Sequence, residues 1–207
     1  MQPASLLARP GIDKETRILI GIATATWRAD WPAFSSWATC GQQLPIARSA
    51  IEETLLQCVL FCGFPRVISA FGHLNKGWPT ETEPSGGALP EADQIPAGDK
   101  LFQAIYGKHD AAVRGMLKSC HHELHDFVLE SAYGRILSRP NLTSRARELI
   151  AAAVLAAQSQ ERQFAGHARG ALHLGATRGE LTEALVTAFA EAPDEVDGWI
   201  SRIPPGS

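Results

Sequence analysis

The most informative absence from this sequence of 207 residues is the C-x-x-C motif, which none of its four cysteines forms. The cysteines are Cys40, Cys58, Cys62 and Cys120. Cys58 and Cys62 lie four residues apart and share a helix face, where helix geometry discourages a disulfide. We interpret the cysteines as buried, reduced, small apolar residues of a cytoplasmic protein. A redox role for Cys40, or for Cys58 with Cys62, is the alternative.

A strong charge of one sign and long apolar runs are also missing. The formal net charge is −3, and no run of Lys and Arg predicts contact with nucleic acid or an anionic membrane. The longest apolar stretches, such as 18–25 and 149–157, are too short to span a bilayer. Residues 1–6 lack the basic segment and long apolar core of an export signal. We therefore expect a cytoplasmic protein with neither nucleic acid nor membrane as a partner.

Sustained two-residue alternation is absent as well, so β-strands are not predicted. Helical signals dominate instead. Asp13 and Thr143 are suited to cap helices, and Thr177 with Glu180 fits the capping-box pattern. The expected helices cover residues 14–23, 33–43, 51–59, 100–119, 123–137, 145–157, 161–174 and 178–186. The sequence therefore predicts an all-α fold.

The first part of the chain recurs 130 residues later without a gap. Seven of the identical pairs are Leu7 and Leu137, Arg9 and Arg139, Pro10 and Pro140, Arg17 and Arg147, Phe34 and Phe164, Glu53 and Glu183, and Leu55 and Leu185. Such self-similarity indicates a duplicated helical unit. We divide the chain into a degenerate first repeat (1–75), a linker rich in Pro, Gly and acidic residues (76–99) and a second repeat (100–207), all within one compact unit.

The two copies differ where chemistry requires polar side chains. The second repeat has Glu148 and His167, whereas the first has Ile18 and Trp37 at those places. A carboxylate inside an apolar run must be paired or functional. The second repeat therefore carries the candidate site.

Structural alternatives exist for both residues of this site. His167 could hydrogen-bond a backbone carbonyl, and Glu148 could form an ion pair with Arg145 or Arg169. Arg139 and Arg147, by contrast, recur in the first repeat as Arg9 and Arg17. Because the apparently inactive copy keeps these arginines, we interpret them as architectural.

The segment His167–Leu181 has the pattern H-x-x-x-A-L-x-x-G-x-T-x-x-E-L and resembles the carboxymuconolactone decarboxylase and AhpD-like (alkylhydroperoxidase-like) family. Residues 133–140 and 145–150 also resemble the decarboxylase branch, and the likeness covers about residues 100–190. The resemblance implies an AhpD-like helical fold, built here from two pseudo-repeats. It also implies a homo-oligomer, either a trimer or a hexamer.

The resemblance implies that the peroxidase branch of that family uses thiol chemistry, with a C-x-x-C pair ahead of the histidine. At the two cysteine positions this chain has Gln160 and Gln163, while the glutamate and histidine correspond to Glu148 and His167. Without a thiolate there is no nucleophile for peroxide and no disulfide to cycle. The departure argues against an AhpD-like peroxidase.

The remaining residues suit acid–base chemistry. We expect a cofactor-free lyase or isomerase that decarboxylates, or transfers a proton on, a small carboxylated or lactone substrate. His167 would donate or shuttle the proton, and Glu148 would orient it or act as a base. Gln160, Gln163 and Arg169 would bind polar groups of this small-molecule substrate. No metal or cofactor is expected, and a non-catalytic oligomeric binding protein is the further alternative.

Two other clusters have ordinary interpretations. His121 and His125 have the spacing of metal ligands on a helix but lack the H-E-x-x-H order, so we predict a solvated helix face. Trp27, Trp31 and Trp37 follow helical spacing and are predicted to be core or subunit-contact residues. Their bulk would fill the equivalent of the site in the first repeat.

Overall fold

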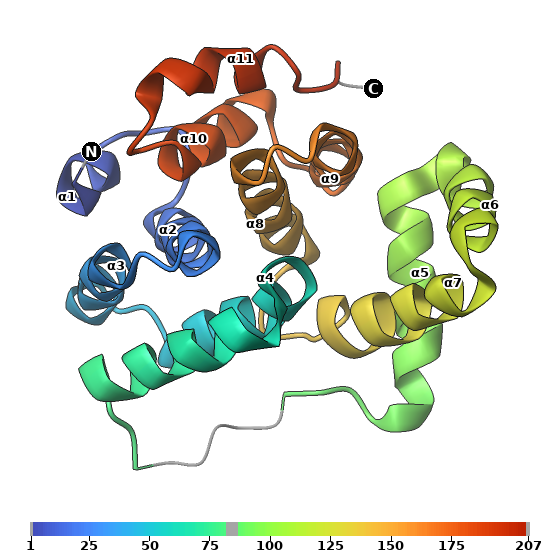
Figure 1. The fold of residues 1–207 in the computed structure, drawn as a ribbon, viewed down its shortest axis with the longest axis horizontal. Coiled ribbons are helices and arrows are strands. Elements are labelled where there is room, and N and C mark those ends of the chain that lie inside the picture. The colour runs from blue at the N-terminus through green and yellow to red at the C-terminus, as the bar shows by residue number, and fades with distance from the viewer. Residues whose placement is uncertain (1, 82–86, 206–207) are drawn as a thin grey trace.

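The structure is a computed structural model that describes residues 2–81 and 87–205, and over those ranges it holds helices and turns without a strand (Figure 1). The predicted all-α class is therefore confirmed. Residues 82–86, which belong to the predicted linker, lie outside the described residues. The helices are α1 (Pro3–Leu7), α2 (Lys14–Arg28), α3 (Trp31–Gln43), α4 (Arg48–Gly77), α5 (Glu91–Tyr106), η1 (Gly107–His109), α6 (Asp110–Cys120), α7 (His122–Phe127), η2 (Val128–Leu137), α8 (Ser144–Ala157), α9 (Glu161–His173), α10 (Arg178–Ala188), η3 (Pro193–Glu195) and α11 (Val196–Ile200).

The 130-residue shift that relates the two sequence copies also relates their helices. Helices α2, α3 and α4 begin at residues 14, 31 and 48, and α8, α9 and α10 begin at 144, 161 and 178. The turns also correspond, because Ala29 and Ser159 both adopt the left-handed conformation, with φ of 54° and 57°. Left-handed residues other than glycine are uncommon. Their recurrence at equivalent places supports the duplication inferred from the sequence.

The predicted helix starts are present. The Asp13 side chain accepts a hydrogen bond from the Thr16 amide at 2.8 Å, and Thr143 accepts one from the Ala146 amide at 3.2 Å. Thr177 begins α10 with a complete capping box. These bonds satisfy amides that the first helical turn leaves without an intrahelical partner.

Several helices differ from the prediction. The predicted helix 100–119 is divided into the end of α5, η1 and α6. Helix α5 begins at Glu91, inside the predicted linker, because Pro90 precedes it and two acids in its first turn favour the positive end of the helix dipole. The predicted helix 123–137 is divided into α7 and the π-helical segment η2. Helix α4 continues to Gly77, although its backbone breaks at Gly63, with φ 75° and ψ 162°.

By length and composition, α4 is apolar enough to cross a membrane, which the short unbroken apolar runs of the sequence do not indicate. In its most apolar window 28% of the residues are buried, and beyond the Gly63 break Phe64 and Ile68 are 69% and 68% exposed. Before the break the same helix carries the buried polar residues Glu53 and Gln57, which bond to α8 and the segment before it. Absence of membrane contact stays a prediction.

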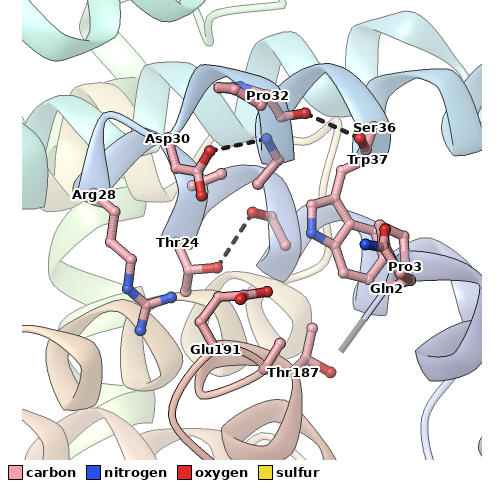
Figure 2. Close-up of a pocket in the computed structure, with 14 residues that line it drawn as sticks. Gln2, Pro3, Thr24, Arg28, Asp30, Pro32, Ser36, Trp37, Thr187 and Glu191 are labelled. Atoms are coloured by element: carbon pink, nitrogen blue, oxygen red, sulfur yellow. Dashed lines mark hydrogen bonds between the residues drawn. The ribbon is translucent and has the colours of Figure 1, made fainter.

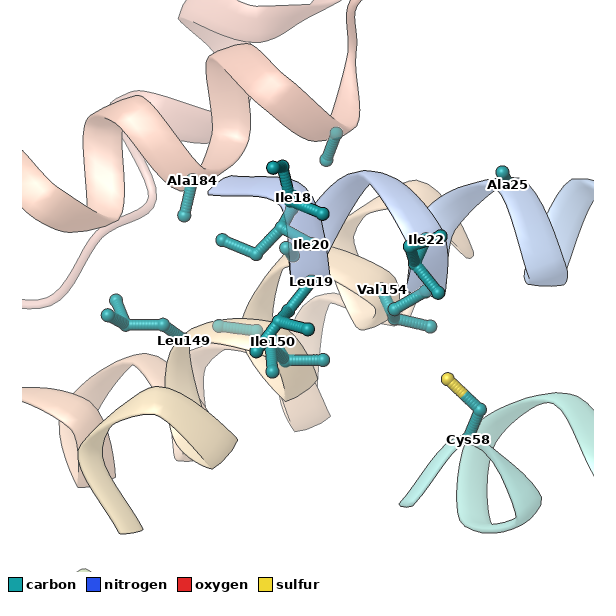
Figure 3. Close-up of a cluster of buried hydrophobic side chains, with 14 of the residues drawn as sticks. Ile18, Leu19, Ile20, Ile22, Ala25, Cys58, Leu149, Ile150, Val154 and Ala184 are labelled. Carbon is teal, nitrogen blue, oxygen red and sulfur yellow. The ribbon is translucent and has the colours of Figure 1, made fainter. Parts of the chain in front are cut away.

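The core lies where α2 and α8 pack together at the centre of the molecule (Figures 1 and 3). Both helices are buried around their whole circumference over residues 16–26 and 147–156, as expected for helices surrounded by others. Leu19 and Ile20 of α2 meet their sequence counterparts Leu149 and Ile150 of α8 in one cluster (Figure 3).

A second, smaller core joins α5 to η2. It contains Phe102 and Ile105 of α5 with Tyr133 and Leu137 of η2. The two segments cross closely at Gly98, where an added Cβ would lie 2.6 Å from the Gly134 nitrogen. Of these two segments, α5 packs against α9 (Figure 1).

Ion pairs connect the two halves reciprocally. Glu53 of α4 accepts hydrogen bonds from Arg139 at 2.6–3.0 Å and from Arg147 at 2.9 Å, and the carboxylate is 3% exposed. Burial acts to raise the pKa of Glu53. The hydrogen bonds and charges of Arg139 and Arg147 outweigh burial, so the pKa of Glu53 lies below its ordinary value.

Glu183 of α10 has the same arrangement with the repeats exchanged. It accepts hydrogen bonds from Arg9 at 2.6 and 2.9 Å and from Arg17 at 2.9 Å. Hydrogen bonding to Arg9, and then to Arg17, lowers the pKa of Glu183 against the effect of burial. The recurring arginines thus have the architectural role predicted for them.

Candidate functional site

Glu148 and His167 lie on consecutive helices that pack against each other. Glu148 is in the second turn of α8 and His167 is midway along α9, with the left-handed turn at Ser159 between the helices. The alanines of α8 are small and let α9 approach closely. Phe164, one turn before His167, is fully buried and fixes the face of α9 that meets the core.

The two side chains form the pair that the sequence suggested. His167 Nδ1 lies 2.9 Å from Glu148 Oε2, with 12% of the His167 side chain and 1% of the Glu148 side chain exposed. Burial acts to lower the pKa of His167, but the charge and hydrogen bond of Glu148 outweigh it and the pKa of His167 is raised. A buried carboxylate thus holds the imidazole through Nδ1 and leaves Nε2 as the ring nitrogen for another partner.

The structural alternatives for these residues are not observed. Arg145 forms its ion pair with Glu180 rather than with Glu148. Arg169 follows His167 by two residues, and about 100° per residue places it on a different side of α9. His167 hydrogen-bonds the carboxylate of Glu148 rather than a backbone carbonyl.

A glycine gives the carboxylate its space. An added Cβ at Gly170 would lie 2.5 Å from Glu148 Oε2 and 2.7 Å from Ile105 Cγ2. Real Cβ atoms essentially never show such short contacts, so a larger residue here requires the carboxylate or α5 to move. Gly170 is therefore part of what positions Glu148 against His167.

The first half of the chain completes the site with Phe61 of α4. Its ring meets the His167 ring edge-on, with centroids 5.9 Å apart and an interplanar angle of 88°. The Gln158 amide donates to the Phe61 carbonyl at 2.8 Å and ties α4 to the end of α8. Sequence analysis missed Phe61 because its role arises from packing between distant segments.

Two tyrosines form another polar group near the pair. The hydroxyls of Tyr106 and Tyr133 are 2.9 Å apart, and both rings pack against Phe102. Burial raises the pKa of Tyr106 to about 12, with a further contribution from the charge of Glu148. Burial first, and then the neighbouring Tyr106 and Glu148, hold the pKa of Tyr133 well above its ordinary value. Both phenols therefore stay protonated near neutral pH.

The predicted substrate-binding residues have different positions. Gln163 precedes His167 by four residues, shares its helix face and is exposed. Gln160 is the exposed residue before α9, and its amide donates to the Gln158 carbonyl at 3.3 Å. Arg169 is half-buried on another side of the helix. The substrate-binding roles of all three stay predictions.

The cysteines are only partly as expected. Cys58 is buried, Cys40 and Cys62 are half-buried, and Cys120 is exposed, so the prediction of burial is wrong for Cys120. A hydrogen bond with Cys62 is the first cause that raises the pKa of Cys58, and burial is the second. The same bond lowers the pKa of Cys62, burial opposes it, and Arg66 assists. A thiol pair therefore exists on α4, outside the motif position.

The histidines of residues 121–125 are not arranged as a metal site among the described residues. In the described parts of the chain, no group of three or more His, Cys, Asp and Glu is placed to hold a metal ion. His125 is nevertheless buried, and its Nδ1 lies 2.8 Å from Asp126 Oδ1. The predicted solvated face is thus wrong for His125, because the short helix α7 turns this residue toward its neighbours.

In the first repeat the equivalent place holds no acid–base pair. Ile18 and Trp37 are both buried, and Trp37 lies against Gly21, whose missing side chain leaves space for the indole ring. The bulk of Trp37 does not fill this region completely. A cavity of about 220 Å³ remains beside it (Figure 2).

Comparison with known proteins finds a family that resembles the part of the chain carrying this site. Residues 123–192 match the sequence model of the Carboxymuconolactone decarboxylase family, and this range contains Glu148, His167 and both helices that carry them. Residues 123–192 are thus similar to the sequences of this family. The match agrees with the resemblance seen in the sequence over these residues.

One curated relative is similar over a longer stretch. Peroxisomal protein 2 of Schizosaccharomyces pombe (strain 972 / ATCC 24843) is 29% identical over 137 residues. The matched segment covers 65% of this chain and 64% of that protein. The chain therefore spans slightly less than two thirds of the length of this relative.

Proposed function

We propose that the second repeat is a cofactor-free lyase or isomerase that transfers a proton on a small carboxylated or lactone substrate. The observation that carries the proposal is the buried 2.9 Å contact between Glu148 Oε2 and His167 Nδ1. It fixes the imidazole and raises its pKa, as a general acid near neutral pH requires. The match to the carboxymuconolactone decarboxylase family supports the same chemistry.

In a decarboxylation, the bond between the substrate carbon and its carboxylate breaks and carbon dioxide leaves. The electron pair of that bond passes into the unsaturated lactone, which acts as the electron sink. Protonated His167 then delivers a proton to the carbanionic carbon through Nε2, while Glu148 stabilises the imidazolium and later favours its reprotonation. In an isomerisation, the same pair removes a proton at one carbon and returns it at another.

Gln163 is the best placed of the predicted substrate-binding residues, since it lies on the same face of α9 as His167 and its side chain is exposed to solvent. Its amide would bind a substrate carboxylate or lactone carbonyl. Gln160 and Arg169 remain proposed contacts with weaker geometric support. Tyr106 and Tyr133 supply hydroxyls near the carboxylate of Glu148.

The test is turnover of carboxymuconolactone, the lactone acid that gives the family its name, followed by release of carbon dioxide. We expect His167→Gln to lower kcat by about 10² to 10⁴-fold, the usual contribution of a positioned acid–base group. The matched control is His109→Gln, because His109 is an exposed histidine at the end of η1 and outside the site. Turnover that survives unchanged in His167→Gln would exclude a proton role for this residue.

The thiol pair on α4 keeps an AhpD-like peroxidase as a second candidate function. Cys62 has a lowered pKa and a neighbouring thiol, which are features of redox cysteines. Its position outside the C-x-x-C place disfavours the candidate. Peroxide reduction by the wild type that is lost in Cys62→Ser would support this candidate over the lyase, whereas insensitivity to alkylation would support the lyase.

The oligomeric state and the cellular compartment of the protein are also proposals. A homo-oligomer, trimer or hexamer, is supported by the exposed apolar side chains Phe64, Ile68 and Phe127. Free cysteines suit a reducing compartment such as the cytoplasm. The name of the relative from Schizosaccharomyces pombe makes peroxisomes the other compartment to examine. If no substrate turns over, an oligomeric binding protein is the remaining function.

A further inference from the structure

The cavity in the first half of the chain is the strongest feature that the proposed function does not use. It measures about 220 Å³ and lies between α2, α3 and the end of α10 (Figure 2). Trp37 at its wall corresponds to His167 after the 130-residue shift. The first repeat therefore has a cavity where the second repeat carries the acid–base pair, which favours binding without chemistry.

The indole nitrogen of Trp37 indicates that the cavity binds a ligand. The residue is 5% exposed and lines the cavity, and Figure 2 shows its indole nitrogen turned toward the other lining residues. Among the described residues, no hydrogen bond engages this nitrogen. A buried indole N–H usually has a partner, and a ligand acceptor in the cavity would provide one.

The lining also carries both signs of charge. Arg28 reaches the cavity from the end of α2, and no hydrogen bond or ion pair to a described residue engages its guanidinium. Asp30 and Glu191 border the same space from α3 and the end of α10. Asp30 uses Oδ1 to accept the Ala33 amide at 3.0 Å, which leaves Oδ2 for a further donor.

Hydroxyl groups add further acceptors. Thr24 donates its proton to the Ile20 carbonyl at 2.9 Å, and Ser36 donates to the Pro32 carbonyl at 3.0 Å. Because these protons are committed, the hydroxyl oxygens face the cavity as acceptors. The lining thus offers a cation and an N–H donor on one hand, and the Asp30 carboxylate with hydroxyl acceptors on the other.

We propose that this cavity binds a small zwitterion of amino-acid size, with its carboxylate at Arg28 and its ammonium group at Asp30. A simple carboxylate would meet the two acids of the lining, and a simple amine would meet Arg28, so a ligand with both charges fits best. The volume lies below the range of about 300 to 1,000 Å³ typical of drug-sized ligands, which indicates a compact molecule. The face of Trp37 suits the ammonium or an apolar side chain beside it.

The first experiment measures binding of each of the twenty standard L-amino acids to the full chain by thermal shift and calorimetry. We expect at least one to bind with a Kd below about 1 mM. Its analogues that lack only the amine or only the carboxylate should bind about tenfold more weakly, because each loses a charged hydrogen bond. Failure of all twenty to bind, or equal binding of the single-charge analogues, overturns the proposal.

The second experiment uses variants that keep the fold. Asp30→Asn removes the charge but preserves the helix cap, since Asn caps as well as Asp. This variant and Arg28→Gln should each weaken binding about tenfold, whereas Arg135→Gln, an exposed arginine on η2, should bind like the wild type. Unchanged binding in both cavity variants, with circular dichroism showing an intact fold, also overturns the proposal. His167→Gln should bind normally, which separates this site from the proposed lyase site.

Discussion

Glu53 and Glu183 are exchanged partners: each lies in one half of the chain and accepts hydrogen bonds from two arginines of the other half. The polar group beside each buried arginine is exchanged as well, because Arg17 donates to Thr187 at 2.9 Å and Arg147 donates to Gln57 at 3.3 Å. The residues of each group correspond under the 130-residue shift. This reciprocity is what a duplicated unit with two-fold pseudo-symmetry would produce.

Removal of Glu53 should strongly destabilise the fold. Glu53→Ala leaves Arg147, which is 1% exposed, without its carboxylate, and an uncompensated buried charge costs about 3–5 kcal/mol. Glu161→Ala is the control, because its ion pair with Arg202 is exposed and should contribute less than about 1 kcal/mol. Urea denaturation measures both. Similar losses in the two variants would contradict the role given to Glu53.

The stability that Glu53 provides should disappear in acid. Its pKa is lowered in the folded chain, so its contribution is complete above the unfolded pKa of about 4.3 and is lost as pH falls through the folded value. The difference in unfolding free energy between wild type and Glu53→Gln should therefore shrink between about pH 5 and pH 3. A difference that stays constant over this range would show that Glu53 is not ionised in the native state.

His167 should show the opposite dependence on pH. Its pKa is raised in the folded chain, so the pair stabilises the fold fully below the unfolded pKa of about 6.5 and loses that effect as pH rises through the folded value. Nuclear magnetic resonance titration should give a pKa of His167 above about 6.5 in the wild type. In Glu148→Gln the pKa should fall, because burial then acts without the opposing carboxylate. An unchanged pKa of His167 in Glu148→Gln would show that Glu148 does not control the protonation of His167.

Gly170→Ala should disturb the candidate site. The new Cβ would crowd Glu148 Oε2 and Ile105, and overpacking of this kind costs about 1–3 kcal/mol. Displacement of the carboxylate should also lower the pKa of His167 and reduce turnover. Gly115→Ala on α6 is the matched control, because nothing lies within 4 Å of its added Cβ and a helical alanine should stabilise by about 0.5–1 kcal/mol. The interpretation fails if both variants behave alike.

The parts of this fold that sequence analysis predicted are those set by neighbouring residues. Asp13, Thr143 and Thr177 cap helices because their side chains reach amides three residues later. The pairing of Glu148 with His167 was anticipated because one turn between two helices joins them and the family resemblance marks both. The first part of α5, residues 91–99, was mistaken for linker because prolines and glycine hid its acidic first turn.

The features that were missed depend on contacts between distant segments. Phe61 reaches His167 only because α4 packs beside the end of α8, and Tyr106 meets Tyr133 only because α5 crosses η2 at two glycines. The carboxylate partners of the recurring arginines lie 86 or more residues away in the chain. Local patterns do not encode such distances. The cavity beside Trp37 was likewise hidden, because residue size alone predicted that this region would be filled.

The exchanged carboxylates have a consequence for how the chain gains its structure. A fragment severed between α4 and α5 would contain Arg17 without Glu183, and its complement would contain Arg147 without Glu53. Each piece would bury a guanidinium with no acid of its own to neutralise it. The two halves must therefore acquire their order together, and co-expressed fragments should recover solubility only through mutual association.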